Sequence, residues 1–327
     1  MDINTPNHLA NGVETVMDKT PRVLVLILTF NGRHLLEESL PSYLANDYEN
    51  FGVVVIDNGS RDDIQEWVQL SYPTVHVLRS DRNLGYSLGF NLGLDYAFNS
   101  QKADYAIVTN DDVRADPKVI AELVKVAESD SKIGFVTGKV YYYDDPNKLQ
   151  TVGKHEDPIR WNGGHIGNRE IDQGQYDKVS ERAFVDDVYT LVRRELYYET
   201  GGYDGTFKFE CEEYDWQARA KNLGYKIYFT PHAKLWHKVS MTLGKGSPIL
   251  TFYDVRNPMI VLLKYKDPLF FRRYFRLHVK EAVRASLVAM KQLRPLVSLA
   301  VWRGLFSGVT WGVRHRKLTL RHLFPIA

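Results

Sequence analysis

The chain has 327 residues, of which 44% are hydrophobic and 25% are charged. This is the balance of a folded globular protein, so disordered, collagen-like and fibrous classes are excluded. The single cysteine, Cys211, excludes a disulfide framework and a cysteine-ligated metal site, and it fits a reducing compartment such as the cytoplasm. Residues 1–20 are polar and lack hydrophobic periodicity, which predicts a mobile lead-in.

The formal net charge of +2 conceals an uneven distribution along the chain. From Arg256 onward there are fifteen Lys and Arg residues and two acids, giving +13, whereas the preceding residues carry −11. Such a basic segment is typical of contact with a membrane surface, a nucleic acid or a phosphorylated ligand. A solvated basic helix face is the alternative interpretation.

Strands and helices alternate through the first part of the sequence. Continuous apolar runs predict strands buried on both faces, and apolar residues at 3.6-residue spacing predict helices. The strands are expected at residues 23–28, 53–56, 75–78 and 105–109, and the helices at residues 35–44, 64–70, 88–98 and from Pro117 onward. This alternation predicts an α/β fold with a mostly parallel sheet, in which ligands bind at the carboxyl ends of the strands.

The second part of the sequence is less regular. Residues 141–184 are rich in Gly, Asp and Asn and predict a long loop. A strand is expected next at residues 185–192, followed by helices at residues 194–200 and 212–223. Beyond residue 247 the pattern is helical, basic and aromatic, and its apolar stretch at residues 296–313 fits a helix at a membrane interface better than a transmembrane span.

Polar residues follow the first two predicted strands. Thr29-Phe30-Asn31-Gly32 comes after the first strand, and Asp57-Asn58-Gly59-Ser60 comes after the second. An acidic residue at the end of the second strand is a common anchor for a ribose or base, although Asp57-Asn58-Gly59-Ser60 also makes a good turn. The first loop lacks the glycine pattern of a nicotinamide site and the chain has no Walker A sequence, so neither class of nucleotide protein is favoured.

Two adjacent carboxylates follow the fourth predicted strand, in the run Asn110-Asp111-Asp112. Carboxylate oxygens are ligands for hard divalent cations, which bridge the oxygens of a diphosphate. An N-cap for the next helix is the alternative, but Asp116 is better placed for it. We therefore favour a metal site over a cap.

A dense acidic cluster, Glu210-Cys211-Glu212-Glu213-Tyr214-Asp215, marks the start of a later helix. It could complement the helix dipole, with Asp215 and Arg219 forming an i,i+4 pair. Clustered carboxylates also raise the pKa of one member, which is how a general base is tuned. A short strand near residue 230 then ends in His237, which is as well explained by a structural role as by metal binding.

These segments resemble the family 2 glycosyltransferases, in particular the bacterial rhamnosyltransferase-like branch. The matching stretches are residues 27–31, 55–60, 83–93, 110–113, 174–177, 192–194 with 201–204, 212–219 and 224–237. Each motif is weak by itself, but eight in the family's order over residues 22–240 are unlikely to agree by chance. The resemblance implies the GT-A type of nucleotide-diphospho-sugar transferase fold.

The resemblance also implies roles for individual residues. The donor nucleotide would be held by Thr29, Asn31, Asp57 and Asn83, with Asn110, Asp111 and Asp112 at the D-x-D position. Asp112 and His237 would bind a divalent metal, Mg²⁺ or Mn²⁺. Glu213 would be the general base in an inverting transfer, with Glu212 as the fallback. Asn110 replaces the first acid of the usual motif, and Glu213 stands where the family normally has aspartate.

This interpretation divides the chain into three parts. After the lead-in, residues 21–247 would form the catalytic domain, with nucleotide-sugar binding in 21–140 and acceptor binding and the base in 141–247. Residues 248–327 would form a basic aromatic helical extension. In its segment 267–294, rings such as Phe271 and Tyr274 alternate with bases and are expected to lie on anionic lipid, unless they pack back onto the catalytic domain or a second subunit.

The expected function is therefore the transfer of a sugar, with rhamnose as one candidate, from a nucleotide-diphosphate donor to a saccharide or lipid-linked acceptor in cell-surface polysaccharide synthesis. The protein is expected in the cytoplasm, peripheral at the inner face of the plasma membrane. No nucleic-acid partner is expected, and a homo-oligomer is left as an open alternative. Two other functions are a sugar nucleotidyltransferase and a non-catalytic nucleotide or nucleic-acid binding protein. The chain lacks the glycine-rich basic loop of a sugar nucleotidyltransferase, and a binding role would leave the acidic cluster unexplained.

Overall fold

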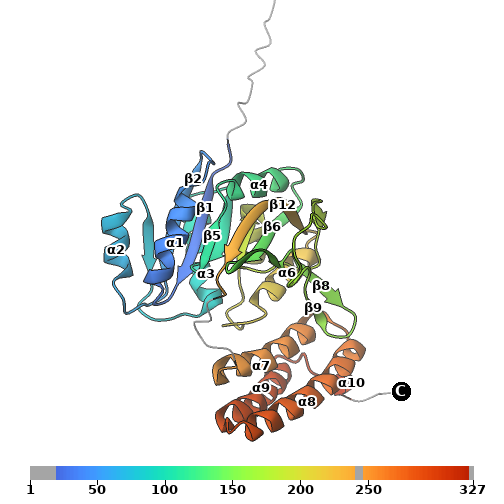
Figure 1. The fold of residues 1–327 in the computed structure, drawn as a ribbon. Helices are drawn as coiled ribbons and strands as arrows, with labels where there is room; N and C mark the ends of the chain where they lie inside the picture. Colours follow the sequence, from blue (N-terminus) through green and yellow to red (C-terminus); the bar gives the residue numbers. More distant parts are fainter. Residues whose placement is uncertain (1–19, 240–245, 324–327) are drawn as a thin grey trace, which may run out of the picture.

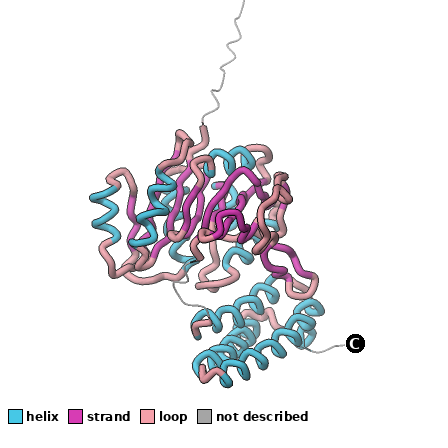
Figure 2. Tube along the Cα trace, viewed as in Figure 1, coloured by secondary structure: helices cyan, strands magenta, loops and turns pink. Residues whose placement is uncertain are grey.

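The computed structural model describes residues 20–239 and 246–323, so the lead-in predicted for residues 1–20 lies outside the described residues except for Thr20. A mixed α/β part extends to the end of β12, and a helical part begins at Pro248 (Figure 1). The helical part lies at one end of the molecule, and the β8–β9 hairpin lies between it and the main sheet (Figure 2).

The elements alternate between strand and helix over the first third of the chain. The strands are β1 (Val23–Thr29), β2 (Phe51–Asp57), β3 (His76–Arg79), β4 (Tyr105–Asn110), β5 (Val113–Ala115), β6 (Ile133–Tyr142), β7 (Asp145–Thr151), β8 (Lys154–Asp157), β9 (Trp161–His165), β10 (Ser180–Glu181), β11 (Tyr189–Arg193) and β12 (Lys226–His237). The helices are α1 (Arg33–Leu44), α2 (Ile64–Ser71), α3 (Tyr86–Asp95), the π-helix η1 (Tyr96–Ser100), α4 (Val119–Ala127), α5 (Arg194–Thr200), α6 (Glu212–Asn222), α7 (Pro248–Tyr265), α8 (Pro268–Lys291), α9 (Pro295–Arg314) and α10 (Leu320–Leu323).

The main sheet has the strand order β10-β12-β6-β11-β4-β1-β2-β3, with β5 paired to β12 and β7 paired to β6. β4, β1, β2 and β3 are parallel, as predicted, whereas β11 runs antiparallel between β4 and β6. In this register Thr29 lies beside Asp57, and Leu28 lies beside Asn110. The polar residues that end β1, β2 and β4 therefore meet at one edge of the sheet.

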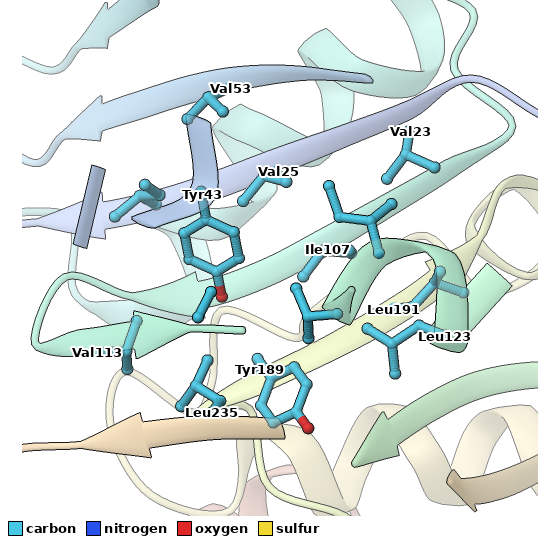
Figure 3. Close-up of a cluster of buried hydrophobic side chains, with 14 of the residues drawn as sticks. Val23, Val25, Tyr43, Val53, Ile107, Val113, Leu123, Tyr189, Leu191 and Leu235 are labelled. Carbon is cyan, nitrogen blue, oxygen red and sulfur yellow. The ribbon is translucent and has the colours of Figure 1, made fainter. Parts of the chain in front are cut away.

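Both faces of the sheet are covered by helices, which explains the unbroken apolar sequence of β1. Val23, Val25 and Ile27 pack with residues of α1, α2 and α4, in the cluster drawn in Figure 3. Leu24 and Leu26 face the other way and pack with residues of α3, α5 and α6. A strand buried on both faces has no polar side to alternate with. The predicted α/β class is confirmed.

The prediction of a long loop over residues 141–184 is wrong, because this segment contains β7, the β8–β9 hairpin and β10. The preceding strand β6 was also not predicted. It contains two glycines and the buried Lys139, whose Nζ lies 2.7 Å from Asp172 and 2.6 Å from Asp177. β7 pairs with β6 through register shifts, so neither strand shows regular alternation. The strand expected at 185–192 begins later, at β11.

The helical part is held together by close packing of α7 against α9. Gly304, Gly308 and Gly312 are spaced four residues apart on α9 and face α7. A Cβ at Gly308 would lie 2.9 Å from the sulfur of Met259, and one at Gly304 would lie 2.8 Å from the carbonyl oxygen of Phe252. The glycines therefore allow the two helices to approach closely. The tail is helical, as expected.

The helical part also has an exposed apolar surface. Among the described residues, α9 is the one helix with the length and composition to cross a membrane, and 39% of its apolar window is buried. Exposed side chains at the α8–α9 turn and on α9 include Leu293, Leu296, Leu299, Trp302 and Phe306. We call these five residues the α8–α9 apolar surface.

Two aromatic residues of α8 do not lie where the sequence placed them. Phe271 is fully buried and Tyr274 is 6% exposed, because both pack in the core shared by the helical part, α6 and the β8–β9 hairpin. For these two rings the expectation of a lipid-facing position is wrong. The alternative that they pack back onto the protein is the correct one.

Candidate active site

The first cavity lies at the carboxyl edge of the sheet and has a volume of about 390 Å³. Six of the residues proposed for nucleotide or metal binding line it: Thr29, Asn83, Asn110, Asp111, Asp112 and His237. Asn58, Tyr86 and Glu210 also line it and were not predicted. Three parallel strand ends, the turn before α6 and the end of β12 thus contribute to one cavity.

Asp57 and Asn31 lie outside the lining of this cavity and stabilise the loops beside it. The Asp57 carboxylate is fully buried, pairs with Arg79, and accepts a hydrogen bond from the Ser60 backbone N–H at 2.9 Å. Asn31 is exposed, and its side-chain oxygen accepts a hydrogen bond from the Arg61 N–H at 2.8 Å. Asp57 and Asn31 thus both hold the loop of residues 57–61, but neither lines the cavity with the other six.

Asn83 and Asn110 are oriented by hydrogen bonds from neighbouring loops. The side-chain oxygen of Asn83 accepts the Gly85 N–H at 2.8 Å, in the turn that starts α3. The Tyr86 hydroxyl lies 3.1 Å from the side-chain oxygen of Asn110 and 3.0 Å from the carbonyl oxygen of Asp187. Tyr86 thus connects the first cavity to the segment that precedes β11.

Asp111 packs directly against the glycine that follows β1. A Cβ at Gly32 would lie 2.2 Å from the Asp111 carboxylate and 2.5 Å from the Thr29 hydroxyl oxygen, so a larger residue would displace both. Burial raises the pKa of Asp111 to about 7, and the charge of Asp112 adds to this shift. The site therefore favours a cation or a hydrogen-bond donor close to this carboxyl group.

Asp112 and His237 are brought together by the pairing of β5 with β12. Val113 lies opposite His237 in this ladder, and the Lys238 N–H donates to the Asp112 carbonyl at 2.9 Å. His237 Nε2 lies 3.1 Å from Asp112 Oδ1, and both residues are less than 10% exposed. The Gln150 side-chain oxygen, 2.8 Å from His237 Nδ1, requires the ring hydrogen on Nδ1.

This pair fits a divalent cation. In the neutral tautomer with its hydrogen on Nδ1, Nε2 carries a lone pair that can bind a cation beside the Asp112 carboxylate oxygen. Adjacent ligands of an octahedral ion with bonds of about 2.1 Å lie about 3.0 Å apart, close to the observed 3.1 Å. Within residues 20–239 and 246–323 there is no group of three or more His, Cys, Asp or Glu side chains that could hold a metal. With Asp112 and His237 as its protein ligands, the ion would keep other positions for diphosphate and water.

A second cavity of about 380 Å³ adjoins the first and shares Tyr86, Asn110 and Glu210 with it. Its lining is strongly acidic, with five carboxylates against one lysine and one histidine. The acidic residues are Asp186, Asp187, Glu210, Glu212 and Glu213, and the others are Lys154 and His165. The predicted metal pair and the predicted base therefore lie in neighbouring cavities.

Glu213 forms part of a buried charge network that the sequence did not predict. Lys154 Nζ, from β8, lies 2.7 Å from Glu213 Oε1 and 2.5 Å from Asp186 Oδ1. Burial opposes the charge of Lys154, but the two carboxylates outweigh it and raise its pKa well above the usual value. His165 Nδ1 lies 2.8 Å from Asp186. Burial would raise the pKa of Asp186, but Lys154 and His165 lower it overall.

Glu212, the fallback base, is in a different state. It is 7% exposed, and its Oε2 has no hydrogen-bond partner within the described part of the chain. Burial, followed by the charges of Glu213 and Glu210, raises its pKa well above the usual range. The raised pKa disfavours the ionised form of Glu212 that a base needs, and Glu212 has no cation paired with it among the described residues, whereas Lys154 pairs with Glu213 at 2.7 Å. This difference favours Glu213.

The turn that precedes α6 has a strained backbone. Glu210 and Cys211 have φ values of +63° and +70°, in the left-handed region. Such conformations cost about 1–3 kcal/mol each for residues other than glycine and are concentrated at functional sites. The Glu210 side chain reaches into both cavities, and their walls raise its pKa to about 7, mainly by desolvation.

Most unpredicted site residues come from residues 141–184, expected as a loop, and from the start of the strand expected at residues 185–192. Gln150 lies on β7, Lys154 and His165 on the hairpin, and Asp186 and Asp187 just before β11. Asp186 and Asp187 are also adjacent acids beside an apolar strand, but they precede the strand instead of following it as Asp111 and Asp112 do. Nothing in the local pattern marks Lys154 or His165.

Comparison with known proteins identifies the family. The model of the family described as glycosyl transferase family 2 matches residues 24–201, more than half of the chain. The chain belongs to glycosyl transferase family 2. The match covers β1 through α5, and therefore includes Asp112, which is predicted to bind metal, but neither Glu213 nor His237.

A curated relative of this family 2 chain is the poly-beta-1,6-N-acetyl-D-glucosamine synthase of Staphylococcus aureus. It is 24% identical over 232 residues, which are 70% of this chain and 52% of the relative, so the chain spans about half the relative's length. The mannosyltransferase PcManGT of Pyrobaculum calidifontis, solved with GDP-Man and Mn²⁺, has a TM-score of 0.54 at 17% identity, covering 92% of this chain and 83% of its own.

GalNAc-T7, solved with UDP, GalNAc and Mn²⁺, has a TM-score of 0.58 at 16% identity, covering 92% of this chain and 58% of its own. At these identities the two structures establish the fold alone. The fold is the GT-A type, with a helical C-terminal extension, as expected from the sequence.

Proposed function

We propose that this chain transfers a sugar from a nucleoside-diphosphate donor to a hydroxyl group of a saccharide or lipid-linked acceptor, with inversion at the anomeric carbon. The observation that carries the proposal is the pair of adjoining cavities. One contains Asp112 and His237, the other contains the carboxylate cluster around Glu213, and Tyr86 and Asn110 form part of both. A donor and an acceptor in these cavities would meet at the shared wall.

The donor nucleotide would bind in the first cavity. Thr29 and Asn83 line it and present polar groups to the base and ribose. Asp57 and Asn31 would act from the loops behind it, with Asp57 available to a base edge if Arg79 shifts. Asn110 and Asp111 would lie beside the ribose and the diphosphate.

Asp112 and His237 would hold the divalent cation, Mg²⁺ or Mn²⁺. When bound, the cation neutralises the diphosphate and so stabilises the leaving group. Gln150 keeps the His237 ring in the orientation in which Nε2 faces Asp112. A partner that fixes the tautomer of a histidine ligand is a recurring feature of metal sites.

Glu213 would act as the base in the acceptor cavity. It takes the proton of the acceptor hydroxyl, whose oxygen forms a bond to the anomeric carbon. The bond between that carbon and the diphosphate oxygen breaks on the opposite face, and the electron pair leaves with the diphosphate. One displacement inverts the centre without a covalent enzyme intermediate. Lys154 pairs with the Glu213 carboxylate at 2.7 Å and holds it in place.

The branch, donor and location are further parts of the proposal. The rhamnosyltransferase-like motifs make dTDP-rhamnose the first donor to test, with GDP- and UDP-sugars next because the structural neighbours bind them. We also propose peripheral contact of the α8–α9 apolar surface with the anionic inner leaflet of the plasma membrane. The bases of α8 and α9 would face the headgroups there, with a lipid-linked acceptor in cell-surface polysaccharide synthesis.

A donor panel tests the proposed function. The full chain is incubated with Mg²⁺ or Mn²⁺, nucleotide sugars and saccharide acceptors, and the released nucleotide is identified. A glycosyltransferase releases a nucleoside diphosphate and gives a product of inverted anomeric configuration by NMR. A sugar nucleotidyltransferase would instead exchange pyrophosphate, and a binding protein would bind nucleotide without turnover. Either of these results would overturn the proposal.

A further inference from the structure

One buried amide of the helical part contacts the turn that carries the active-site acids. Asn257, on α7, is fully buried, and its Nδ2 donates to the carbonyl oxygens of Phe209 at 2.6 Å and Glu210 at 2.8 Å. Its Oδ1 accepts a hydrogen bond from Arg256 Nη1 at 2.6 Å. Both amide hydrogens and the amide oxygen are therefore used, so the orientation of the side chain is fixed.

The two carbonyls belong to the strained turn. Glu210 and Cys211 are the consecutive left-handed residues, and Glu212 and Glu213 follow as the first residues of α6. A left-handed pair of non-glycine residues is retained only where surrounding contacts hold it. The Asn257 amide provides two such contacts, and both come from outside the catalytic α/β part.

A second set of contacts from α7 fixes the helix that follows the turn. Tyr265 donates its hydroxyl hydrogen to Asp215 Oδ1 at 2.7 Å, and Lys264 pairs with Asp215 and with Asp204, at 2.9 Å from the latter. Asp215 is fully buried and also pairs with Arg219 at 3.0 Å. α7 therefore contacts both the Glu210–Cys211 turn and the first helical turn of α6.

We infer that Asn257 is a positioning residue for the transfer reaction: its amide holds the Glu210–Cys211 turn in the conformation that directs Glu213 into the acceptor cavity. The inference rests on the proposed function for its effect on turnover, but its effect on the turn is independent of any substrate. It gives the helical extension a role inside the catalytic centre, in addition to any role in membrane contact.

The test uses Cys211, the only cysteine in the chain, as a probe of the turn. Its side chain is only partly accessible, so a turn released from Asn257 should expose it to a thiol reagent such as DTNB. The variant is Asn257→Ala, and the control is Met259→Ala. Met259 is equally buried on α7 but contacts Gly308 of α9, on the other side of the helix.

We expect Cys211 in Asn257→Ala to react at least about tenfold faster than in the wild type, with no comparable change in Met259→Ala. With the donor found in the panel, kcat should fall about 10–100-fold while the donor KM changes less than threefold, because misplacing a reacting group by about 1 Å costs turnover on this scale. Asn257→Ser keeps one donor group and should be intermediate. It also replaces the alanine variant if that variant does not fold.

Three results would overturn the inference. They are an unchanged Cys211 rate in Asn257→Ala, an equal acceleration in both variants, and faster labelling with an unchanged kcat. If instead the wild type transfers no sugar, the proposed function fails. In that case the labelling rates still decide whether Asn257 holds the turn.

Discussion

Lys154 offers a test of the charge network, because one substitution leaves two buried carboxylates without their cation. Lys154→Met keeps most of the length of the side chain and removes the ammonium. The side chains of Lys154, Asp186 and Glu213 are 7%, 15% and 12% exposed, so water can replace little of what is lost. Removing one partner from a buried ion pair costs about 3–5 kcal/mol, and we expect a decrease of that size in the free energy of unfolding at pH 8.

The pH dependence of this loss has a definite sign. In the wild type the pKa of Asp186 is lowered, so its ionised form contributes stability that is present above the unfolded pKa and is lost in strong acid. Without Lys154 the desolvation remains, the pKa of Asp186 rises, and ionisation in the folded state becomes unfavourable. The difference between variant and wild type should therefore be largest near pH 8 and decrease toward about pH 4.

Urea unfolding followed by circular dichroism at both pH values measures the difference. The matched control is Lys226→Met, which removes a lysine at the same 2.7 Å from Asp130, in a pair whose side chains are 42% and 36% exposed. Exposed pairs contribute about 0–1 kcal/mol. If Lys154→Met loses no more stability than Lys226→Met, or loses it equally at both pH values, the network does not stabilise the site as described.

Four further predictions concern the site and the surface. Glu213→Gln should lower kcat by about 10²–10⁴-fold and leave donor binding unchanged in calorimetry, since it removes a general base without changing the shape of the side chain. A near-normal kcat would contradict the assignment of Glu213 as the base. Asp112→Ala should abolish Mn²⁺-dependent nucleotide binding. His237→Ala should weaken this binding less, because an imidazole brings no formal charge. Mn²⁺-dependent binding retained in Asp112→Ala would refute the metal pair. The pKa of Glu210 is raised to about 7, so its ionisation destabilises the fold as pH rises from about 4.5 to 7. Glu210→Gln should therefore raise Tm more at pH 8 than at pH 5, and an equal gain at both pH values would argue against the raised pKa. In flotation assays the wild type should bind anionic vesicles, less so in high salt, and Phe306→Ser should bind more weakly; equal recovery with neutral vesicles would count against membrane contact.

The first cavity was predictable because it follows from local sequence. The apolar runs of β1, β2 and β4 are buried, and polar residues at the ends of parallel strands must meet at one edge of the sheet. Thr29 and Asp111 could therefore be placed near each other from the sequence alone. The i,i+4 pair of Asp215 with Arg219 was likewise predictable from helix geometry and is present at 3.0 Å.

The second cavity was not predictable in the same way, because its charges are compensated by residues far apart in the sequence. Lys154 is buried on a short hairpin strand, and its position makes sense only once Asp186 and Glu213 are beside it. Asn257 looks like an ordinary polar residue in a helix, since its partners are backbone carbonyls 47 and 48 residues away. Neither the period of a strand nor that of a helix records such contacts.

The pairing of β5 with β12 has a consequence for the order of events during synthesis. Asp112 and His237 are separated by 125 residues, and β12 must insert beside β6 and β10 before the two side chains can meet. At translation rates of about 5–20 residues per second, the interval between them is on the order of ten seconds. For most of that interval neither Glu213 nor His237 has been made, so under the proposed function an unfinished chain would be unable to transfer sugar.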